Sequence, residues 1–301
     1  MIKRLQTAHS SIATLFLLLL TFTGISQTEF ADYRSATNPF YWKNRKPNPG
    51  YWQQDVHYNI NAELNDSSDI VSGHQEMTYW NNSPYQISYL YFHLYSNAQN
   101  KHSYAADLYK NNGYRLKFGK YRNQDLGINV SMVNQNGTQL KTELDNTILK
   151  VYLATPIKPG ESTTLQLDFK TYFDKEAIRN RMKMFNFFGQ KHYDLVHWYP
   201  RVSVVDQKFG WVTDQHMDHE FYGEFGSYHV ELTLPNHYIG DGTGVLINEN
   251  EVLPLELRKQ LDIRNFLKKP FNSAPSKIVE RNGTKKTWKF SAINVHDFAF
   301  T

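Results

Sequence analysis

Apolar and polar residues alternate with a period of two along most of the chain. The alternation is clearest from Val56 to Leu64, and it returns in segments 70–80, 87–95, 128–132, 148–153, 163–173, 228–234, 287–292 and 295–300. Successive side chains of a strand point to opposite faces of a sheet, so each segment predicts a strand with one buried and one solvated face. Turn signals such as Asn134 to Gly137 separate the segments. Strands that recur without intervening helices predict an all-β fold, a twisted sheet or a sandwich.

Three regions depart from this period. Residues 27–50 contain several Pro and no sustained pattern, which predicts a lead-in segment on the domain surface. Residues 97–123 are polar and rich in Tyr and Lys, and connections of this length are often functional or mobile loops. Residues 254–268 place leucines at helical spacing among charges, with Pro254 suited to a first helical turn and Pro270 beyond the end. We therefore expect one short inserted helix near 254–268.

The first residues predict an export signal. Lys3 and Arg4 precede an apolar run over residues 12–22, and the small residues Gly24 and Ser26 follow it. The run is shorter than the ~20 residues that a membrane-spanning helix needs. We place the cleavage after Ser26, so that residues 1–26 form a signal peptide. The expected protein is exported, periplasmic or extracellular, with no transmembrane segment after signal cleavage.

Composition limits the possible partners. About 275 residues remain after the signal, enough for one large or two ordinary domains. The absence of cysteine excludes a disulfide framework. The net charge of +4 includes two residues of the predicted signal, so the mature chain is close to balance and implies neither nucleic acid nor an anionic membrane. Basic residues gather in 257–269 and at Lys285 and Lys286, where a solvated helix face or turn is the simpler interpretation.

The string HMDHEFYG (216–223) is the most suggestive catalytic motif. A zinc peptidase needs a second histidine one helical turn after the first, with the glutamate between them as general base. A glycine stands at that position, and the string lies among strands, so we do not assign a catalytic zinc site. His216, Asp218 and His219 could hold a metal together with His197. Surface or core positions are the more usual outcome in a chain with 12 histidines.

No other catalytic motif occurs in the sequence. It has no G-x-S-x-G nucleophile elbow, no phosphate-binding loop ending in G-K-[ST] and no cysteine nucleophile. The glycine-rich stretch 240–244 precedes a strand and a turn, so we interpret it as backbone geometry. The aromatic string 196–200 and the pair Gly210-Trp211 fit two interpretations, the rigid wall of a ligand site or a corner of the core.

Six strings follow one another in a characteristic order. They are YWQQDVHYNINAEL (51–64), LYFHLYSNA (90–98), NTILKVYLATPIKPGESTTLQLDF (146–169), HWYPRVSVVDQKFGW (197–211), HEFYGEFGSYHVELTLPNHYIGDGTGVL (219–246) and TWKFSAINVHDFAF (287–300). Together they resemble successive landmarks of the N-terminal domain of the aminopeptidase N family of zinc metallopeptidases. The resemblance covers about residues 51–301. Its specificity lies in the combined order of the strings.

The resemblance implies a saddle-shaped β domain at residues 51–293 that packs on a thermolysin-like catalytic domain. In that family the catalytic domain carries a Gly-x-x-Glu-Asn strand, an H-E-x-x-H helix and a later glutamate ligand, and this sequence contains none of them. Zinc is therefore expected in a missing catalytic domain, with no cofactor in this chain. Residues 294–301 resemble the stretch just before the catalytic domain, so we expect the chain to stop at that junction.

The resemblance also implies a contribution to the substrate cleft. In the family a polar side chain near the W-Y-P string anchors the free amino group of the substrate, and His197 is its nearest equivalent by position. The family has Gln or Glu there, so the histidine is a departure that bears on amino-end recognition. The other cleft residues that the resemblance implies are Trp198, Tyr199, Arg201, Asp206 and Glu220.

These observations lead to one main hypothesis and two alternatives. The main hypothesis is a cleft-shaping, non-catalytic domain of an exported zinc-dependent aminopeptidase. Its partners would be a peptide substrate and its own catalytic domain, and residues 1–301 alone should hydrolyse nothing. One alternative is a secreted β-sandwich module that binds peptide or glycan, with Trp198 and Trp211 as stacking platforms for a sugar. The other is a non-catalytic scaffold.

Overall fold

The computed structural model describes residues 33–175, 183–217 and 222–301. The predicted signal peptide and the candidate residues Asp218, His219 and Glu220 lie outside the described residues. Within those three ranges, no helix has both the length and the apolar character needed to cross a lipid bilayer.

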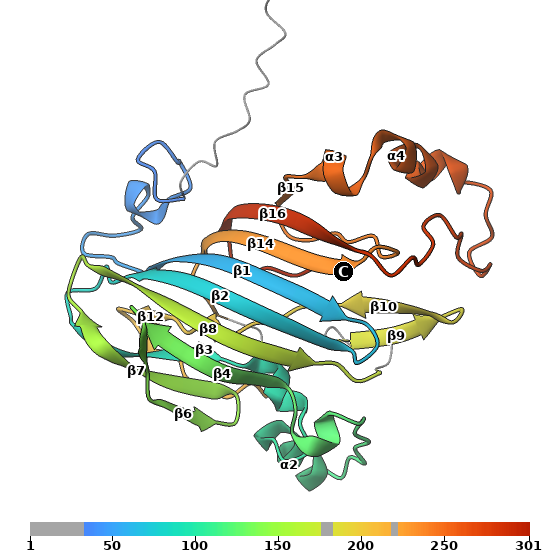
Figure 1. The fold of residues 1–301 in the computed structure, drawn as a ribbon. Coiled ribbons are helices and arrows are strands. Elements are labelled where there is room, and N and C mark those ends of the chain that lie inside the picture. Colours follow the sequence, from blue (N-terminus) through green and yellow to red (C-terminus); the bar gives the residue numbers. More distant parts are fainter. Residues whose placement is uncertain (1–32, 176–182, 218–221) are drawn as a thin grey trace, which may run out of the picture.

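The larger layer is a twisted sheet of eight strands (Figure 1). Its strands follow the order β15 (Val245–Leu246), β16 (Lys285–Val295), β14 (Gly226–Pro235), β1 (Asp55–Asn65), β2 (Ile70–Trp80), β8 (Ser162–Tyr172), β4 (Ile128–Gln135) and β5 (Thr138–Gln139). Strands β1 and β14 pair in parallel, and the other neighbours pair antiparallel. Every second residue of β14 is buried, because alternate side chains point into the core.

A four-stranded sheet forms the second layer. Its order is β11 (Arg201–Val202), β3 (Ile87–His93), β7 (Ile148–Ile157) and β6 (Thr142–Asp145). Side chains of both sheets form one buried apolar cluster, to which Ile60 and Leu167 contribute from the large sheet and Phe92 and Val151 from the small one. Two hairpins pair β9 (Lys183–Phe187) with β10 (Gln190–Asp194), and β12 (Val205–Asp206) with β13 (Gly210–Trp211). The all-β fold predicted from the alternation is confirmed.

The turn predicted at Asn134 to Gly137 is also confirmed. It joins β4 to β5, and its two central residues, Asn136 and Gly137, have φ angles of +50° and +80°. A two-residue hairpin turn of this handedness matches the right-handed twist of the flanking strands, and Asn followed by Gly is the sequence that tolerates it best.

The helices differ in part from expectation. Residues 97–123, expected to form a loop, contain the helix α2 (Tyr104–Asn111). Its N-terminus is capped by Ser103, whose hydroxyl accepts a hydrogen bond from the Ala106 backbone N–H at 3.1 Å. The apolar pattern of this helix is weak because its buried positions are alanines. Short 3-10 turns occur at η1 (Trp42–Asn44), η2 (Tyr95–Gln99), η3 (Arg122–Gln124) and η4 (Ile263–Asn265).

The helix expected near 254–268 is present in shorter form. It is α4 (Leu255–Leu261), which follows the single-turn helix α3 (Glu249–Val252). Pro254 stands at the N-cap of α4 and not in its first turn. The chain leaves the sheet after β15 and returns to it at β16, and the two helices lie in this excursion beyond the edge of the sheet (Figure 1).

The prediction of a strand over residues 295–300 is wrong. The strand predicted at 287–292 instead continues to Val295 as β16. Asn294, with a φ of +58°, is the extra residue at a register shift in the pairing of β16 with β14, and β16 ends at the next residue, Val295. Beyond it only Phe300 forms isolated bridges, to Leu195 and to Gly242. The alternation of Phe298 and Phe300 reflects burial in the core without membership of a strand.

The lead-in segment packs on the sheet through a buried carboxylate. Asp55, fully buried at the start of β1, accepts hydrogen bonds from Arg34 Nε at 3.0 Å, the Tyr41 hydroxyl at 2.8 Å and Trp42 Nε1 at 2.6 Å. Charge-assisted hydrogen bonds of this kind are stronger than neutral ones. The segment also has its own small aromatic cluster, in which Trp42 packs with Trp52 and other rings.

Candidate functional site

The segment after β10 brings His197 beside the core. Leu195 and Phe300 form two backbone hydrogen bonds, from Leu195 N–H to Phe300 O at 2.8 Å and from Phe300 N–H to Leu195 O at 3.1 Å. His197 then adopts a φ of +52°. Such a conformation costs a non-glycine residue ~1–3 kcal/mol, so the surrounding contacts must stabilise it. This bend sets residues 197–199 against residues 297–298.

Asp297 joins these two segments. Its Oδ2 lies 3.1 Å from Nδ1 of His197, and its Oδ1 accepts a hydrogen bond from the Tyr199 hydroxyl at 2.6 Å. Burial alone would raise the pKa of Asp297. The hydrogen bond from His197, the positive charge of Arg201 and the bond from Tyr199 outweigh burial and lower the pKa to about 2. Asp297 is therefore ionised at neutral pH, although its side chain is only 19% exposed.

Trp198 and Tyr199 are fully buried. Trp198 Nε1 donates to the Phe298 carbonyl at 3.0 Å, and the Trp198 carbonyl accepts from the Thr171 hydroxyl at 2.6 Å. The Tyr199 ring packs edge-on against Tyr58, with centroids 5.5 Å apart. Of the two interpretations of this aromatic string, the structure supports the corner of the core. Both residues can support a cleft from behind, but neither offers a ring face to a ligand.

Arg201 is a buried cation beside Asp297. Burial opposes its charge, but the Asp297 carboxylate outweighs this effect and the pKa of Arg201 lies above its usual value. Within the described part of the chain, Nη1 and Nη2 of Arg201 have no hydrogen-bond partner. Gly223 lies directly against the guanidinium, and a Cβ at this position would overlap Nη2. The glycine that ends the HMDHEFYG string therefore leaves room for Arg201.

Asp206 is the last residue of β12 and lies apart from this network. Its Oδ1 accepts hydrogen bonds from the backbone N–H groups of Lys208 at 2.9 Å and Phe209 at 2.7 Å, and its Oδ2 accepts one from the Tyr222 hydroxyl. It therefore stabilises the hairpin of β12 and β13. Of the six cleft residues implied by the resemblance, the structure brings His197, Trp198, Tyr199 and Arg201 together, leaves Asp206 apart and does not describe Glu220.

Two functional candidates were missed by the sequence reasoning. In the sequence, Asp297 is an ordinary residue of the string 287–300. Only its ion pair with His197 in the folded chain identifies it as a site residue. Glu224 is a buried carboxyl that accepts a hydrogen bond from the Gln54 backbone N–H at 3.4 Å. Burial raises the pKa of Glu224 well above its usual value, and the charges of Asp55 and Asp206 raise it further. No pattern in the sequence distinguishes this glutamate from a surface one.

The structure offers no metal centre in the part of the chain that it describes. No group of three or more His, Asp or Glu side chains is placed there to hold a metal ion. His197 and His216 both pack edge-on against the ring of Tyr95, with centroids 5.0 Å and 5.6 Å away. The two histidines are thus neighbours of one aromatic ring, and their proposed partners Asp218 and His219 lie outside the described residues.

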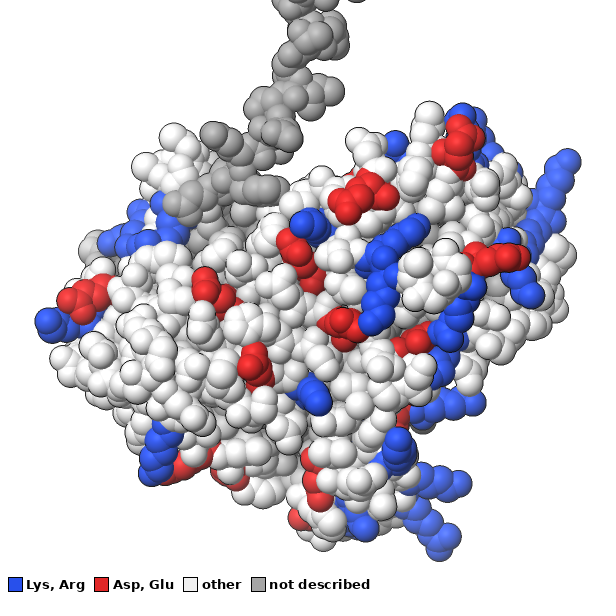
Figure 2. All heavy atoms as spheres, in the orientation of Figure 1, with Lys and Arg blue, Asp and Glu red and all other residues white. Residues whose placement is uncertain are grey.

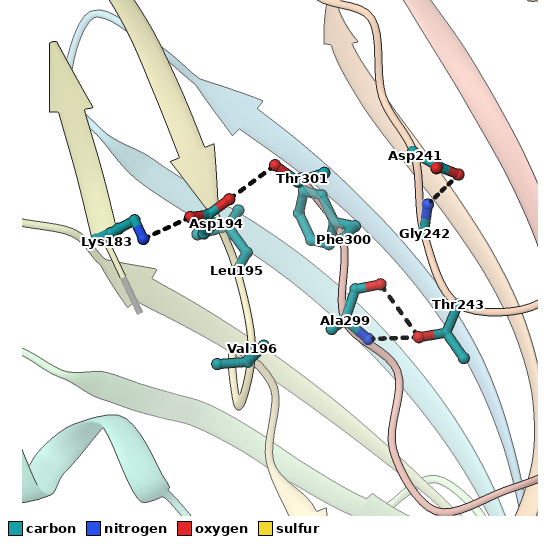
Figure 3. Close-up of a pocket in the computed structure, with 10 residues that line it drawn as sticks. All are labelled: Lys183, Asp194, Leu195, Val196, Asp241, Gly242, Thr243, Ala299, Phe300 and Thr301. Carbon is teal, nitrogen blue, oxygen red and sulfur yellow. Dashed lines mark hydrogen bonds and ion pairs between the residues drawn. The ribbon is translucent and has the colours of Figure 1, made fainter. Parts of the chain in front are cut away.

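A pocket of about 550 Å³ adjoins this network at Val196, the residue before His197 (Figure 3). Asp194 on its wall pairs with Lys183 Nζ at 2.7 Å and accepts a hydrogen bond from the Thr301 hydroxyl at 2.8 Å. Burial opposes ionisation of Asp194, but these two hydrogen bonds outweigh it and lower its pKa. Asp241 adds a second carboxylate to the lining. Lys183 balances the charge of Asp194, so Asp241 leaves the lining with a net charge of −1, which favours a ligand that carries a positive charge.

Comparison with known proteins gives a structural likeness only. No family model and no curated protein sequence matches the chain. The solved structures similar to it include the M1 zinc metallopeptidase from Deinococcus radiodurans, at 15% identity and a TM-score of 0.41. They also include a mutant M1 zinc metallopeptidase from the same organism bound to a Tyr-Ser-Ala substrate, at 16% identity and a TM-score of 0.42. In both cases the match covers 82% of this chain and 42% of the other, so the chain spans less than half the length of these enzymes.

Proposed function

We propose that this chain is the N-terminal, non-catalytic domain of an exported, zinc-dependent aminopeptidase-like metallopeptidase, in which it shapes one wall of the substrate cleft. The proposal rests on the ordered sequence landmarks and on the way in which two of them meet. Zinc would be held by an H-E-x-x-H helix in another part of the full protein. There it would polarise the scissile carbonyl and activate water.

The observation that carries the proposal is the contact between the strings 197–211 and 287–300. About 100 residues separate them, yet His197 and Tyr199 both bind Asp297, and Trp198 binds the carbonyl of Phe298. An ionised carboxylate that binds two side chains of a distant segment holds the backbone of both segments in place. The W-Y-P landmark is therefore held rigidly beside the segment that resembles the junction with the catalytic domain.

The acidic pocket beside His197 fits the same role. An aminopeptidase substrate carries an ammonium group at its free end, and the Asp241 carboxylate, whose charge no lining residue balances, makes this pocket favourable for a cation. His197 stands where the resembled family has Gln or Glu. In our proposal the Asp297 carboxylate orients the imidazole, and His197 contacts the amino end of the peptide.

The first test is the coding sequence beyond Thr301. An H-E-x-x-H motif within roughly the next hundred codons agrees with the proposal, and a stop codon directly after Thr301 contradicts it. The second test is His197→Gln in the full-length protein, with His74→Gln as the control because His74 is an exposed residue of β2 that contributes nothing to the candidate site. Only the first substitution should change KM for peptides with a free amino end.

A binding module remains the second candidate because of a separate aromatic pocket. It has a volume of about 710 Å³ and is lined by Trp42, Tyr51, Trp52 and Tyr85 with Lys43 and Lys46 beside them. Trp198 is buried and cannot be the stacking platform first considered. Glycan binding by the full chain that is lost in Tyr85→Ala, with unchanged thermal unfolding, would favour this candidate over the peptidase domain.

A further inference from the structure

The excursion between β15 and β16 exposes large apolar side chains that no other element covers. We define the basic insert as residues 255–277, which comprise α4, η4 and the chain that follows. None of the residues of α4 is buried. Phe271 is 102% exposed, Ile263 and Leu267 are each 73% exposed, and Leu255 is 58% exposed. Isolated exposed apolar residues are ordinary, but four within 17 positions of one short segment indicate a contact surface.

The basic insert is also the most positive part of the chain. It contains six Lys or Arg and two Asp or Glu, a net charge of +4, which equals the net charge of all 301 residues. Three of its cations pair with carboxylates, in the ion pairs Arg258–Glu249, Lys259–Glu256 and Arg264–Asp262. Lys268, Lys269 and Lys277 have no carboxylate partner among the described residues. Figure 2 shows Lys and Arg side chains projecting from the side of the molecule where Figure 1 places α4 and the chain after it.

Apolar and basic side chains alternate at close range in this segment. Leu267, Lys268, Lys269 and Phe271 follow one another around Pro270, so two exposed apolar groups flank two uncompensated ammonium groups. A nucleic acid would use the cations but would leave Leu267 and Ile263 in water. An anionic lipid surface uses both, because apolar side chains enter the interface while Lys and Arg remain at the headgroups.

We propose that the basic insert is a peripheral membrane-binding element that docks on a bilayer containing anionic phospholipid. Leu267 and Phe271 enter the interface, and Lys268, Lys269 and Lys277 contact the phosphate groups. The net charge of the whole chain does not reveal this surface, because the positive and negative charges outside the basic insert cancel. The inference is independent of the proposed peptidase role, because it concerns an excursion from the sheet that contributes no residue to the candidate site.

The test is co-sedimentation of the full chain with vesicles of phosphatidylglycerol and phosphatidylcholine, compared with vesicles of phosphatidylcholine alone. Residues 1–26 are identical in every variant, so binding through them cancels when variants are compared. The double variant L267A/F271A should bind at least roughly tenfold more weakly, given the usual contribution of a large apolar side chain. The double variant K268E/K269E should lose roughly twentyfold or more on anionic vesicles. The matched control is Phe209→Ala, because Phe209 is 62% exposed and its ring lies 4.5 Å from the ammonium group of Lys208.

A site-specific readout complements the binding ratios. The chain has no cysteine, so Phe271→Cys gives one attachment point for an environment-sensitive dye. A blue shift on anionic vesicles that is absent with a dye at Phe209→Cys agrees with the proposal. Three results would overturn it: equal binding by all variants, equal binding to neutral vesicles, or self-association that the L267A/F271A variant abolishes in the absence of lipid. The last of these would assign the surface to a protein contact.

Discussion

Removal of the Asp297 carboxylate should destabilise the protein strongly. The substitution Asp297→Asn takes away the charge that balances the buried Arg201 and the acceptor of the His197 ion pair. Removing one partner of a buried charge pair typically costs ~3–5 kcal/mol, because the other charge stays buried without compensation. We therefore expect the free energy of unfolding in urea at pH 7 to fall by that amount. Asp241→Asn is the control, since this carboxylate is exposed nearby and should change stability little.

The pH dependence provides an independent check on the same residue. Folding lowers the pKa of Asp297 from 3.8 to about 2, a difference worth ~2 kcal/mol of stability at neutral pH. For a carboxyl group with a lowered pKa, this contribution is complete above pH ~4 and is lost as the pH falls through the folded pKa. The stability difference between wild type and Asp297→Asn should thus shrink between pH 4 and pH 2. A free energy of unfolding for Asp297→Asn within about 0.5 kcal/mol of the wild-type value at pH 7 would refute the stabilising role assigned to the Asp297 carboxylate.

Three further substitutions test neighbouring features. Gly223→Ala should lower the thermal unfolding temperature and reduce the free energy of unfolding by ~1–3 kcal/mol, because the new Cβ overlaps the Arg201 guanidinium. Unchanged unfolding would contradict a fixed position of the Arg201 side chain. Asp55→Asn should release the lead-in segment, seen as faster proteolysis near Trp42 while the main unfolding transition persists, and equal protection in both proteins would contradict this. Glu224→Gln should be at least as stable as wild type at pH 8. A buried carboxyl with a raised pKa destabilises the folded wild-type protein as the pH rises above the pKa of the unfolded chain, and glutamine does not titrate. If the variant becomes less stable relative to wild type between pH 5 and pH 8, Glu224 is not a buried neutral carboxyl.

The strands could be predicted because their signal is local. In β1 and β14 every second side chain faces the core, so the period of two appears directly in the sequence. The helix α2 gave no such signal, since its buried residues are the small side chains Ala105 and Ala106. Residues 295–300 gave a false strand signal, because Phe298 and Phe300 are buried by tertiary packing beyond the end of β16 at Val295.

The candidate site could be predicted only in part. The landmark strings indicated His197, Trp198 and Tyr199, but burial of the two aromatic residues depends on the packing of both sheets and cannot be read from their sequence neighbours. Asp297 becomes recognisable only when residues separated by 100 positions lie side by side. The proposed membrane-binding surface could not be predicted for a related reason. The helical pattern of the basic insert normally implies a helix with one buried face, but no residue of α4 is buried.

The central claim is tested most directly by peptide hydrolysis, measured side by side for the complete gene product and for residues 1–301. The account predicts that the complete protein removes residues from peptides with a free amino end, and that it loses this activity on chelation and regains it with zinc. Residues 1–301 alone should show no hydrolysis under the same conditions. Chelator-sensitive hydrolysis by residues 1–301, or a complete protein without zinc-dependent peptidase activity, would contradict the account.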